Sequence, residues 1–307
     1  MIPEAVKIVE VGPRDGLQNA GKVLSTQIKA ELIEGLVNCG LRAIEVGSLV
    51  APSAVPQMAD SEAVYARIEK GTGVEYIMLL ANQRGLERAI AAGIRHLAVF
   101  CAASETFSHK NVACSIGESL KRIEAICSQA KAQNRVLRGY VSCVLGCPYE
   151  GRVALDRVSE VAVRLFELGC REISLGDTIG VGTPGMVREL IERIAQRIPL
   201  DHVAVHFHDT FGQALANVYA ALESGVRIVD SSVGGLGGCP FAPGASGNLA
   251  SEDLLFMLNG LGIETGVDLE RLVETAWSIS DRLNSRPASR VARAMRPKQR
   301  RALFFSS

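Results

Sequence analysis

The sequence predicts an α/β protein of the TIM (β/α)8 barrel class, with a short helical extension after the barrel. Short apolar runs rich in Val and Ile alternate with longer amphipathic segments along the 307 residues, and the alternation repeats eight times. Nearly continuous apolar strands are typical of parallel sheets that helices cover on their faces. An open doubly wound sheet is the alternative, and eight repeats favour the closed barrel.

Each apolar run predicts one strand, because it is short, rich in β-branched residues and bounded by turn or helix signals. The segments between the runs have helical periodicity. The eight runs are residues 6–12, 43–48, 75–81, 96–104, 138–144, 172–178, 203–209 and 228–235.

Helix ends are also marked in the sequence. The segment 25–40 opens on the cap pair Ser-Thr and closes on Gly40, and the segment 156–170 closes on Gly169. Glycines at 93 and 225 stand in the same position, just before a strand. We therefore expect one catalytic domain over 1–307, with the barrel at about 6–265 and a helical, basic tail at about 266–307.

Composition narrows the classes of partner. Lys+Arg and Asp+Glu balance at 33 each, which gives no reason to expect nucleic acid or an anionic membrane as a partner. No apolar run approaches a membrane span, and the chain enters a strand pattern without a leader, so we expect a cytoplasmic protein. Eight scattered cysteines indicate reduced thiols; a zinc knuckle at Cys143 and Cys147 is the alternative, but no second pair matches it.

Polar side chains stand where the predicted strands end, at the face that carries the active site in this fold. Each has a structural interpretation as well: an Asp after a strand is often a helix cap, a His can be packed in a core, and a Cys can be inert. The structural interpretations weaken when all of them must hold at one end of one barrel. The residues are Arg14, Asp15, Glu45, Asp177, His206, His208, Cys239 and Asn248.

His206 and His208 lie two apart in a strand, so their imidazoles share one face. Together with a carboxylate and a carboxamide oxygen from the rim, they would supply four ligands to a divalent ion. Two nitrogen and two oxygen donors favour Mg²⁺ or Mn²⁺, although imidazole also suits zinc. Arg14 could hold an enolate oxygen, and Cys239, in a glycine-rich loop, could move a proton. This apparatus suits carbon-carbon cleavage through an enolate.

At these motifs the sequence resembles the 3-hydroxy-3-methylglutaryl-CoA (HMG-CoA) lyases of the DRE-TIM metallolyase superfamily. The resemblance runs from about residue 8 to about residue 266. It rests on "VEVGPRDGLQN", "IEVGS" with "VPQMAD", "AVFCAASETFSHKNVACSI", "RGYVSCVLGCPYEG", "EISLGDTIGVGTPG", "AVHFHDTFGQALAN" and "DSSVGGLGGCPFAPGASGNLASED".

The resemblance implies a TIM barrel that cleaves HMG-CoA to acetyl-CoA and acetoacetate with Mg²⁺ or Mn²⁺, in leucine catabolism and ketone body formation. It also implies the roles of individual residues, and a homo-oligomer, a dimer, in a bacterial cytoplasm. The metal ligands would be Asp15, His206, His208 and Asn248, the catalytic residues Arg14, Cys239, Glu45 and Asp177, and the substrate-binding residues Arg14, Gln18 and Ser48.

One loop departs from the family pattern, which usually reads close to "SFVSPKWVPQ" where this chain reads "SLVAPSAVPQ". The departure leaves open a longer or differently branched 3-hydroxyglutaryl-CoA as the substrate. A Claisen-type synthase of the same superfamily and a non-catalytic barrel also compete with the lyase; the short C-terminal region opposes the first and the complete set of site residues opposes the second. The basic tail from Asp281 is either a solvated end or a contact with coenzyme A phosphates or a neighbouring subunit.

Overall fold

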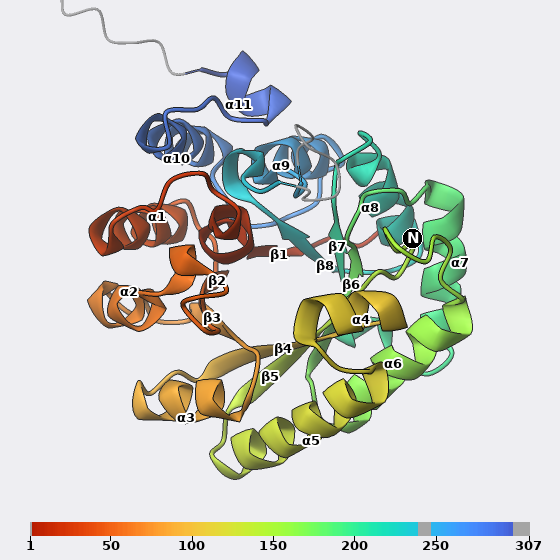
Figure 1. Ribbon diagram of the computed structural model, residues 1–307. Helices are drawn as coiled ribbons and strands as arrows, with labels where there is room; N and C mark the ends of the chain where they lie inside the picture. Colours follow the sequence, from red (N-terminus) through yellow and green to blue (C-terminus); the bar gives the residue numbers. More distant parts are fainter. Residues whose placement is uncertain (1, 239–246, 297–307) are drawn as a thin grey trace, which may run out of the picture.

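The computed structural model describes residues 2–238 and 247–296, and it contains a closed barrel of eight parallel strands (Figure 1). Each strand pairs with the next in the chain, and β1 pairs with β8 to close the barrel. The strands are β1 (Lys7–Glu10), β2 (Ala43–Leu49), β3 (Glu75–Leu80), β4 (His96–Ala102), β5 (Val136–Ser142), β6 (Glu172–Asp177), β7 (Val203–Phe207) and β8 (Ile228–Ser231).

Helices form a ring outside the strands (Figure 1). In the described ranges these are α1 (Thr26–Asn38), α2 (Ser61–Arg67), α3 (Gln83–Ala91), α4 (Glu105–Val112), α5 (Ile116–Ala132), α6 (Leu155–Glu167), α7 (Pro184–Ala195), α8 (Ala214–Glu223) and α9 (Ser251–Gly260). Two further helices, α10 (Leu269–Arg282) and α11 (Arg290–Ala294), follow the barrel. Helix α10 packs against α1 and α9, and α11 packs against α9 and α10.

The helix boundaries follow the local signals. The hydroxyl of Ser25 accepts a hydrogen bond from the backbone of Ile28 and caps α1, as predicted. Gly40, Gly93, Gly169 and Gly225 all have φ between 72° and 103°, the left-handed conformation that ends a helix and turns the chain toward the next strand. The glycines that the sequence singled out therefore have the conformation that glycine adopts most easily.

The apolar core has two parts. The larger part fills the space between the strands and the ring of helices. The smaller part fills the inside of the barrel and includes Val9, Val11, Ile77, Leu79 and Tyr140. The barrel is therefore packed, and the polar side chains that point inward lie among these apolar layers.

The structure confirms the predicted barrel and the helical extension after it. All eight predicted strands are present, with bounds that differ by a few residues. The first predicted strand ends early because residues Gly12–Gly16 form a turn of π-helix, η1. Residues 297–307, the end of the predicted basic tail, lie outside the described residues.

Candidate metal centre and active site

The turn η1 places Arg14 and Asp15 at the end of the barrel where the strands finish. Pro13 occupies its first turn, where a missing N–H costs nothing, and the backbone N–H groups of the next three residues all point to the carbonyl of Val11. Gly16 allows a close approach, because a Cβ there would lie 2.8 Å from both the Ser232 hydroxyl and the Leu236 side chain. The "GPRDG" motif is therefore built to fit against the segment that follows β8.

Asp15, His206 and His208 form a compact group at this mouth. Their ligand atoms all lie within 4.8 Å of one another, and both imidazoles are buried. His206, on β7, and His208, which directly follows its last residue, lie on the same side of the chain, as their spacing predicted, and their ring centroids are 5.4 Å apart. His206 Nε2 lies 3.9 Å from Asp15 Oδ2.

Asn248 joins this group from the segment after β8. Its side-chain amide donates to Asp15 Oδ2 at 2.8 Å and to the Leu236 carbonyl at 3.2 Å. Its backbone forms an isolated bridge with His208. All four predicted ligand residues therefore meet at one place, although 233 residues separate Asp15 from Asn248.

The charges around this group shift the pKa values of its three members in different directions. Burial alone would raise the pKa of Asp15, but Arg14 and the two imidazoles outweigh it and hold that pKa below its usual range. Burial, with the charge of His206, lowers the pKa of His208 to about 4, so His208 is neutral at neutral pH. Burial also opposes the charged form of His206, but Asp230 and Asp15 raise its pKa. A cation would take the place of that proton.

These residues fit a divalent cation. The Nδ1 atom of His208 is buried and has no hydrogen-bond partner, which is costly unless a ligand satisfies the ring. A carboxylate, two imidazoles and a carboxamide converge within reach of one ion, with no thiolate among the described members of the group.

Arg14 is held between two carboxylates. Its Nε and Nη2 lie 2.8 and 2.7 Å from Glu45 Oε2, and its Nη1 donates to Asp15. Glu45 is completely buried, and burial raises its pKa although Arg14 opposes the shift. The Tyr140 hydroxyl also donates to Glu45 Oε2, at 3.2 Å. Glu45 is therefore positioned to orient the guanidinium, as expected of a buried carboxylate that must be paired.

Asp177, at the end of β6, is bonded to the backbone of the loop that follows. Its carboxylate accepts hydrogen bonds from the N–H groups of Gly180, Val181 and Gly182 at 2.7 to 3.3 Å. Burial raises its pKa, and these N–H groups oppose the shift. Asp177 therefore shapes the loop after β6. Asp209, which by the period of two points to the other face of β7, accepts from the first backbone N–H of α8.

Of the three remaining predicted residues, the structure describes two. The hydroxyl of Ser48, at the end of β2, is buried without a hydrogen-bond partner. Gln18 lies half-buried just after η1. Cys239 lies outside the described residues. Nothing in the positions of the first two opposes contact with a substrate.

Four polar residues of the barrel interior were not predicted as site residues. They connect Glu45 to His206 through the inside of the barrel. One signal in the sequence could have found two of them, because Arg138 and Tyr140 are two apart in a strand, like the histidines. The four are Arg138, Tyr140, Ser174 and Asp230.

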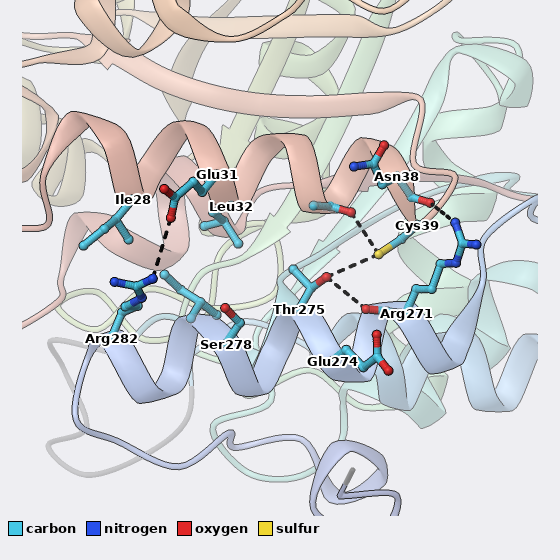
Figure 2. Close-up of a pocket in the computed structure, with 12 residues that line it drawn as sticks. Ile28, Glu31, Leu32, Asn38, Cys39, Arg271, Glu274, Thr275, Ser278 and Arg282 are labelled. Atoms are coloured by element: carbon cyan, nitrogen blue, oxygen red, sulfur yellow. Dashed lines mark hydrogen bonds and ion pairs between the residues drawn. The ribbon is translucent and has the colours of Figure 1, made fainter. Parts of the chain in front are cut away.

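A groove on the outside of the barrel, between α1 and α10, is a second place where a ligand could be sought (Figure 2). Its charged side chains have partners within the groove: Arg282 lies 3.8 Å from Glu31, and Arg271 donates to the backbone carbonyl of Asn38. Among the described residues, none of its buried polar side-chain atoms lacks a partner. Buried side-chain atoms without a partner do occur at the mouth, at Glu45, His206 and His208, so we assign the chemistry there.

A zinc knuckle has no support in the structure. Cys147 accepts two backbone N–H groups, from Tyr149 and Glu150, and contacts the Ser104 hydroxyl at 2.9 Å. Over residues 2–238 and 247–296, the group at Asp15 is the only cluster of three or more metal-type side chains. The cysteines of these ranges are all free and buried.

In the same ranges, no helix has the length and apolar character needed to cross a membrane.

Fold and site together define a (β/α)8-barrel protein with a candidate divalent-metal site and an ion-paired arginine at its C-terminal mouth. The chain belongs to the HMGL-like family, whose model matches residues 5–279. It is 54% identical over 293 residues to the mitochondrial hydroxymethylglutaryl-CoA lyase of Macaca fascicularis, covering 95% of this chain and 90% of that protein.

Solved structures agree with this family. The hydroxymethylglutaryl-CoA lyase of Pseudomonas aeruginosa is 51% identical, with a TM-score of 0.94 over 96% of this chain and 98% of the other. An HMG-CoA lyase of Acinetobacter baumannii, solved with coenzyme A and 3-methylmalate, is 35% identical, with a TM-score of 0.91 over 96% and 97% of the two chains.

Proposed function

We propose that this protein is a metal-dependent carbon-carbon lyase that cleaves HMG-CoA to acetyl-CoA and acetoacetate. The observation that carries the proposal is the meeting of Asp15, His206, His208 and Asn248 beside Arg14 at the barrel mouth. The family and the high identity to lyases over nearly the whole chain support it. We also propose that residues 1–307 form one catalytic domain.

In this proposal Asp15, His206, His208 and Asn248 would hold Mg²⁺ or Mn²⁺. A cation bound there supplies Lewis acidity to oxygen atoms of the substrate. The C3 hydroxyl gives its proton to water in the mouth and its oxygen becomes the keto oxygen of acetoacetate. The electron pair of the breaking C2–C3 bond becomes the enolate of acetyl-CoA. Arg14 stabilises the charge on the enolate oxygen, since its guanidinium stays protonated and is held in place before the reaction.

Other residues position these groups or complete the reaction. Glu45 orients Arg14, because it accepts from two nitrogens of the guanidinium. Asp177 supports the mouth by holding the loop after β6. We assign Ser48, whose buried hydroxyl has no partner, and Gln18 to substrate binding. Cys239 delivers the proton to the C2 carbon of the enolate.

The assignment of Cys239 can be tested by the Cys239→Ser variant. We expect turnover to fall while the metal content, measured by elemental analysis, stays the same, because the hydroxyl is a weaker acid than the thiol. Loss of the metal in this variant would instead make Cys239 a structural support of the site.

The acyl group is the part of the substrate for which a second candidate remains. Residues 51–54, after β2, are exposed and carry only small side chains or proline, so they leave space at the mouth. A longer or differently branched 3-hydroxyglutaryl-CoA is therefore the second candidate. The condensing direction of a Claisen-type synthase is disfavoured, because the relatives that share about half of their residues with the chain, such as those of Macaca fascicularis and Pseudomonas aeruginosa, are lyases.

One experiment tests the proposed function and the acyl group together. The purified protein is incubated with HMG-CoA or with longer 3-hydroxyglutaryl-CoA analogues, and free acetoacetate or its homologue is measured. We expect cleavage of HMG-CoA that stops with a chelator and returns with Mg²⁺ or Mn²⁺. Turnover of HMG-CoA that survives chelation would refute the metal requirement, and preference for a longer analogue would select the second candidate.

We further propose that the protein is a homo-oligomer, a dimer, and acts in a bacterial cytoplasm in leucine catabolism and ketone body formation. Exposed apolar side chains support self-contact: Phe256 lies on α9, and Leu261 and Met295 stand at the ends of α9 and α11. The free, buried cysteines of the described ranges suit a reducing compartment. Light scattering of the purified protein would measure the mass of the oligomer.

A further inference from the structure

His206 is tied to the barrel on the side of its ring that faces away from Asp15. Its Nδ1 atom lies 3.3 Å from Asp230 Oδ2, while its Nε2 atom faces the Asp15 carboxylate. Asp230 stands on β8 directly beside His206 on β7 in the strand register. No aligned hydrogen bond to this buried Nδ1 forms among the described residues, so Asp230, inside the barrel, is the carboxylate placed to accept its proton, while Asp15 lies on the mouth side of the ring.

Asp230 cannot move freely to follow the ring. Arg138 donates to both of its carboxylate oxygens, at 2.6 and 3.2 Å, and the Ser174 hydroxyl donates to Oδ2 at 2.9 Å. The Asp230 side chain is completely buried, and Arg138 is nearly so. Arg138, whose guanidinium is always charged, pairs with both carboxylate oxygens, as expected of a buried carboxylate that must be paired.

The same arginine also reaches the other half of the site. Arg138 Nη1 donates to the Tyr140 hydroxyl at 2.9 Å, and Tyr140 in turn donates to Glu45, the partner of Arg14. The polar side chains thus form a ring of contacts that begins at Asp15, passes through Arg14 and Glu45, and returns through Asp230 and His206. The 3.9 Å approach of His206 Nε2 to Asp15 Oδ2 closes it. A fixed ring of this kind limits the orientations that each member can adopt.

We propose that Asp230, fixed by Arg138 and Ser174, is the positioning residue that selects the tautomer and orientation of His206. A carboxylate beside Nδ1 requires the proton on that atom, which leaves the lone pair of Nε2 directed at the mouth beside Asp15. The inference rests on the metal site of the proposed function and names the support that this site needs inside the barrel.

The test is the Asp230→Asn variant, which keeps the shape of the side chain and removes its charge. We expect Mn²⁺ affinity, measured by electron paramagnetic resonance of the free ion, to fall about 10- to 100-fold. We also expect ¹⁵N NMR of the metal-free, histidine-labelled protein at alkaline pH to show His206 protonated on Nδ1 in the wild type and a mixture of tautomers in the variant. If Asp230 had only a structural role, the folded variant would keep both the Mn²⁺ affinity and the His206 tautomer of the wild type.

Two further variants of neighbouring side chains complete the design. Ser174→Ala removes one hydrogen bond to the same Asp230 oxygen, so it should weaken Mn²⁺ binding about 2- to 10-fold and shift the tautomer in the same direction. The matched control is Ser231→Ala, the next residue of β8, whose hydroxyl bonds to Ser251 instead. It should leave Mn²⁺ affinity and the tautomer unchanged.

Unchanged affinity and an unchanged tautomer in folded Asp230→Asn would overturn the proposal. If that variant does not fold, as judged by circular dichroism, the tautomer in Ser174→Ala decides. A wild type that binds no Mn²⁺ would refute the metal site of the proposed function, while the tautomer comparison in the metal-free protein would still decide the role of Asp230.

Discussion

Both ends of the barrel carry one cation between two carboxylates, and they use it differently. At the N-terminal end, Lys7 Nζ lies 2.7 Å from Glu75 and 2.7 Å from Glu172. At the C-terminal mouth, Arg14 bridges Asp15 and Glu45. Side-chain exposure is 34% for Lys7 and 8% for Arg14.

This difference in burial changes what the charges can do. An ion pair that water reaches contributes about 0–1 kcal/mol to stability and little else. A buried pair costs desolvation but acts on a nearby charge in a medium of low dielectric constant. The same arrangement therefore stabilises the fold at the N-terminal end and prepares a reaction at the mouth, in line with the general asymmetry of TIM barrels.

The comparison predicts its largest effect at the metal group. His206→Ala removes one candidate ligand, so we expect metal-dependent turnover to fall by about 10³-fold or more, since a cation contributes several kcal/mol to the transition state. Circular dichroism should show a folded protein, and Mn²⁺ titration should show weaker binding. Full turnover with normal metal content would remove His206 from the site.

Arg14 tests whether the buried cation acts on developing charge. Arg14→Met should lower kcat by about 10²- to 10³-fold, on the scale of losing a preorganised charged donor. The matched control is Arg14→Lys, which keeps the charge and loses the planar fork, so its kcat should lie between those of Arg14→Met and the wild type. An unchanged kcat in folded Arg14→Met would show that the ion pair at the mouth, like the one at the N-terminal end, only stabilises the fold.

The residues at the mouth were more accessible to sequence reasoning than those that support them. Strand order and the period of two were enough to place Asp15, His206 and His208 together, because all parallel strands end at the same face. Asp230 and Arg138 were missed, since they pair across the barrel at a separation of 92 residues, and local patterns carry no information on such partners. Position alone also cannot show what a carboxylate at a strand end contacts, and the three backbone N–H groups that Asp177 accepts became visible only in the structure.

Glu252 tests how the burial of a carboxylate changes the dependence of stability on pH. It is fully buried on α9 and accepts from the Gly234 backbone at 2.8 Å, and burial raises its pKa from 4.5 to about 8. A raised pKa in the fold means that its contribution is complete below about pH 4.5 and is lost as the pH rises toward 8. Between pH 4.5 and 8 the unfolding free energy should therefore fall less in Glu252→Gln than in the wild type, by about 1 kcal/mol or more.

Chemical denaturation of both proteins across this pH range measures the effect. Equal stability at the acid end is the internal control, because Glu252 is protonated there in both the folded and the unfolded state. Part of the slope should remain in the variant, since burial also raises the pKa of Glu10 to about 7. Curves for the two proteins that run parallel would contradict the assignment.

The smallest effect is expected at the N-terminal end, and with the opposite sign of pH dependence. Burial would raise the pKa of Glu75, but Lys7 outweighs it and lowers that pKa, so the pair stabilises the fold above the unfolded pKa of Glu75 and loses this contribution on acidification. Lys7→Met should reduce the unfolding free energy at neutral pH by about 0–1 kcal/mol and flatten its acid limb. Its kcat for HMG-CoA should equal that of the wild type, because the pair lies at the end of the barrel away from the mouth. A marked fall in kcat with normal stability would contradict the assignment of a stabilising role to the N-terminal end and of a catalytic role to the mouth.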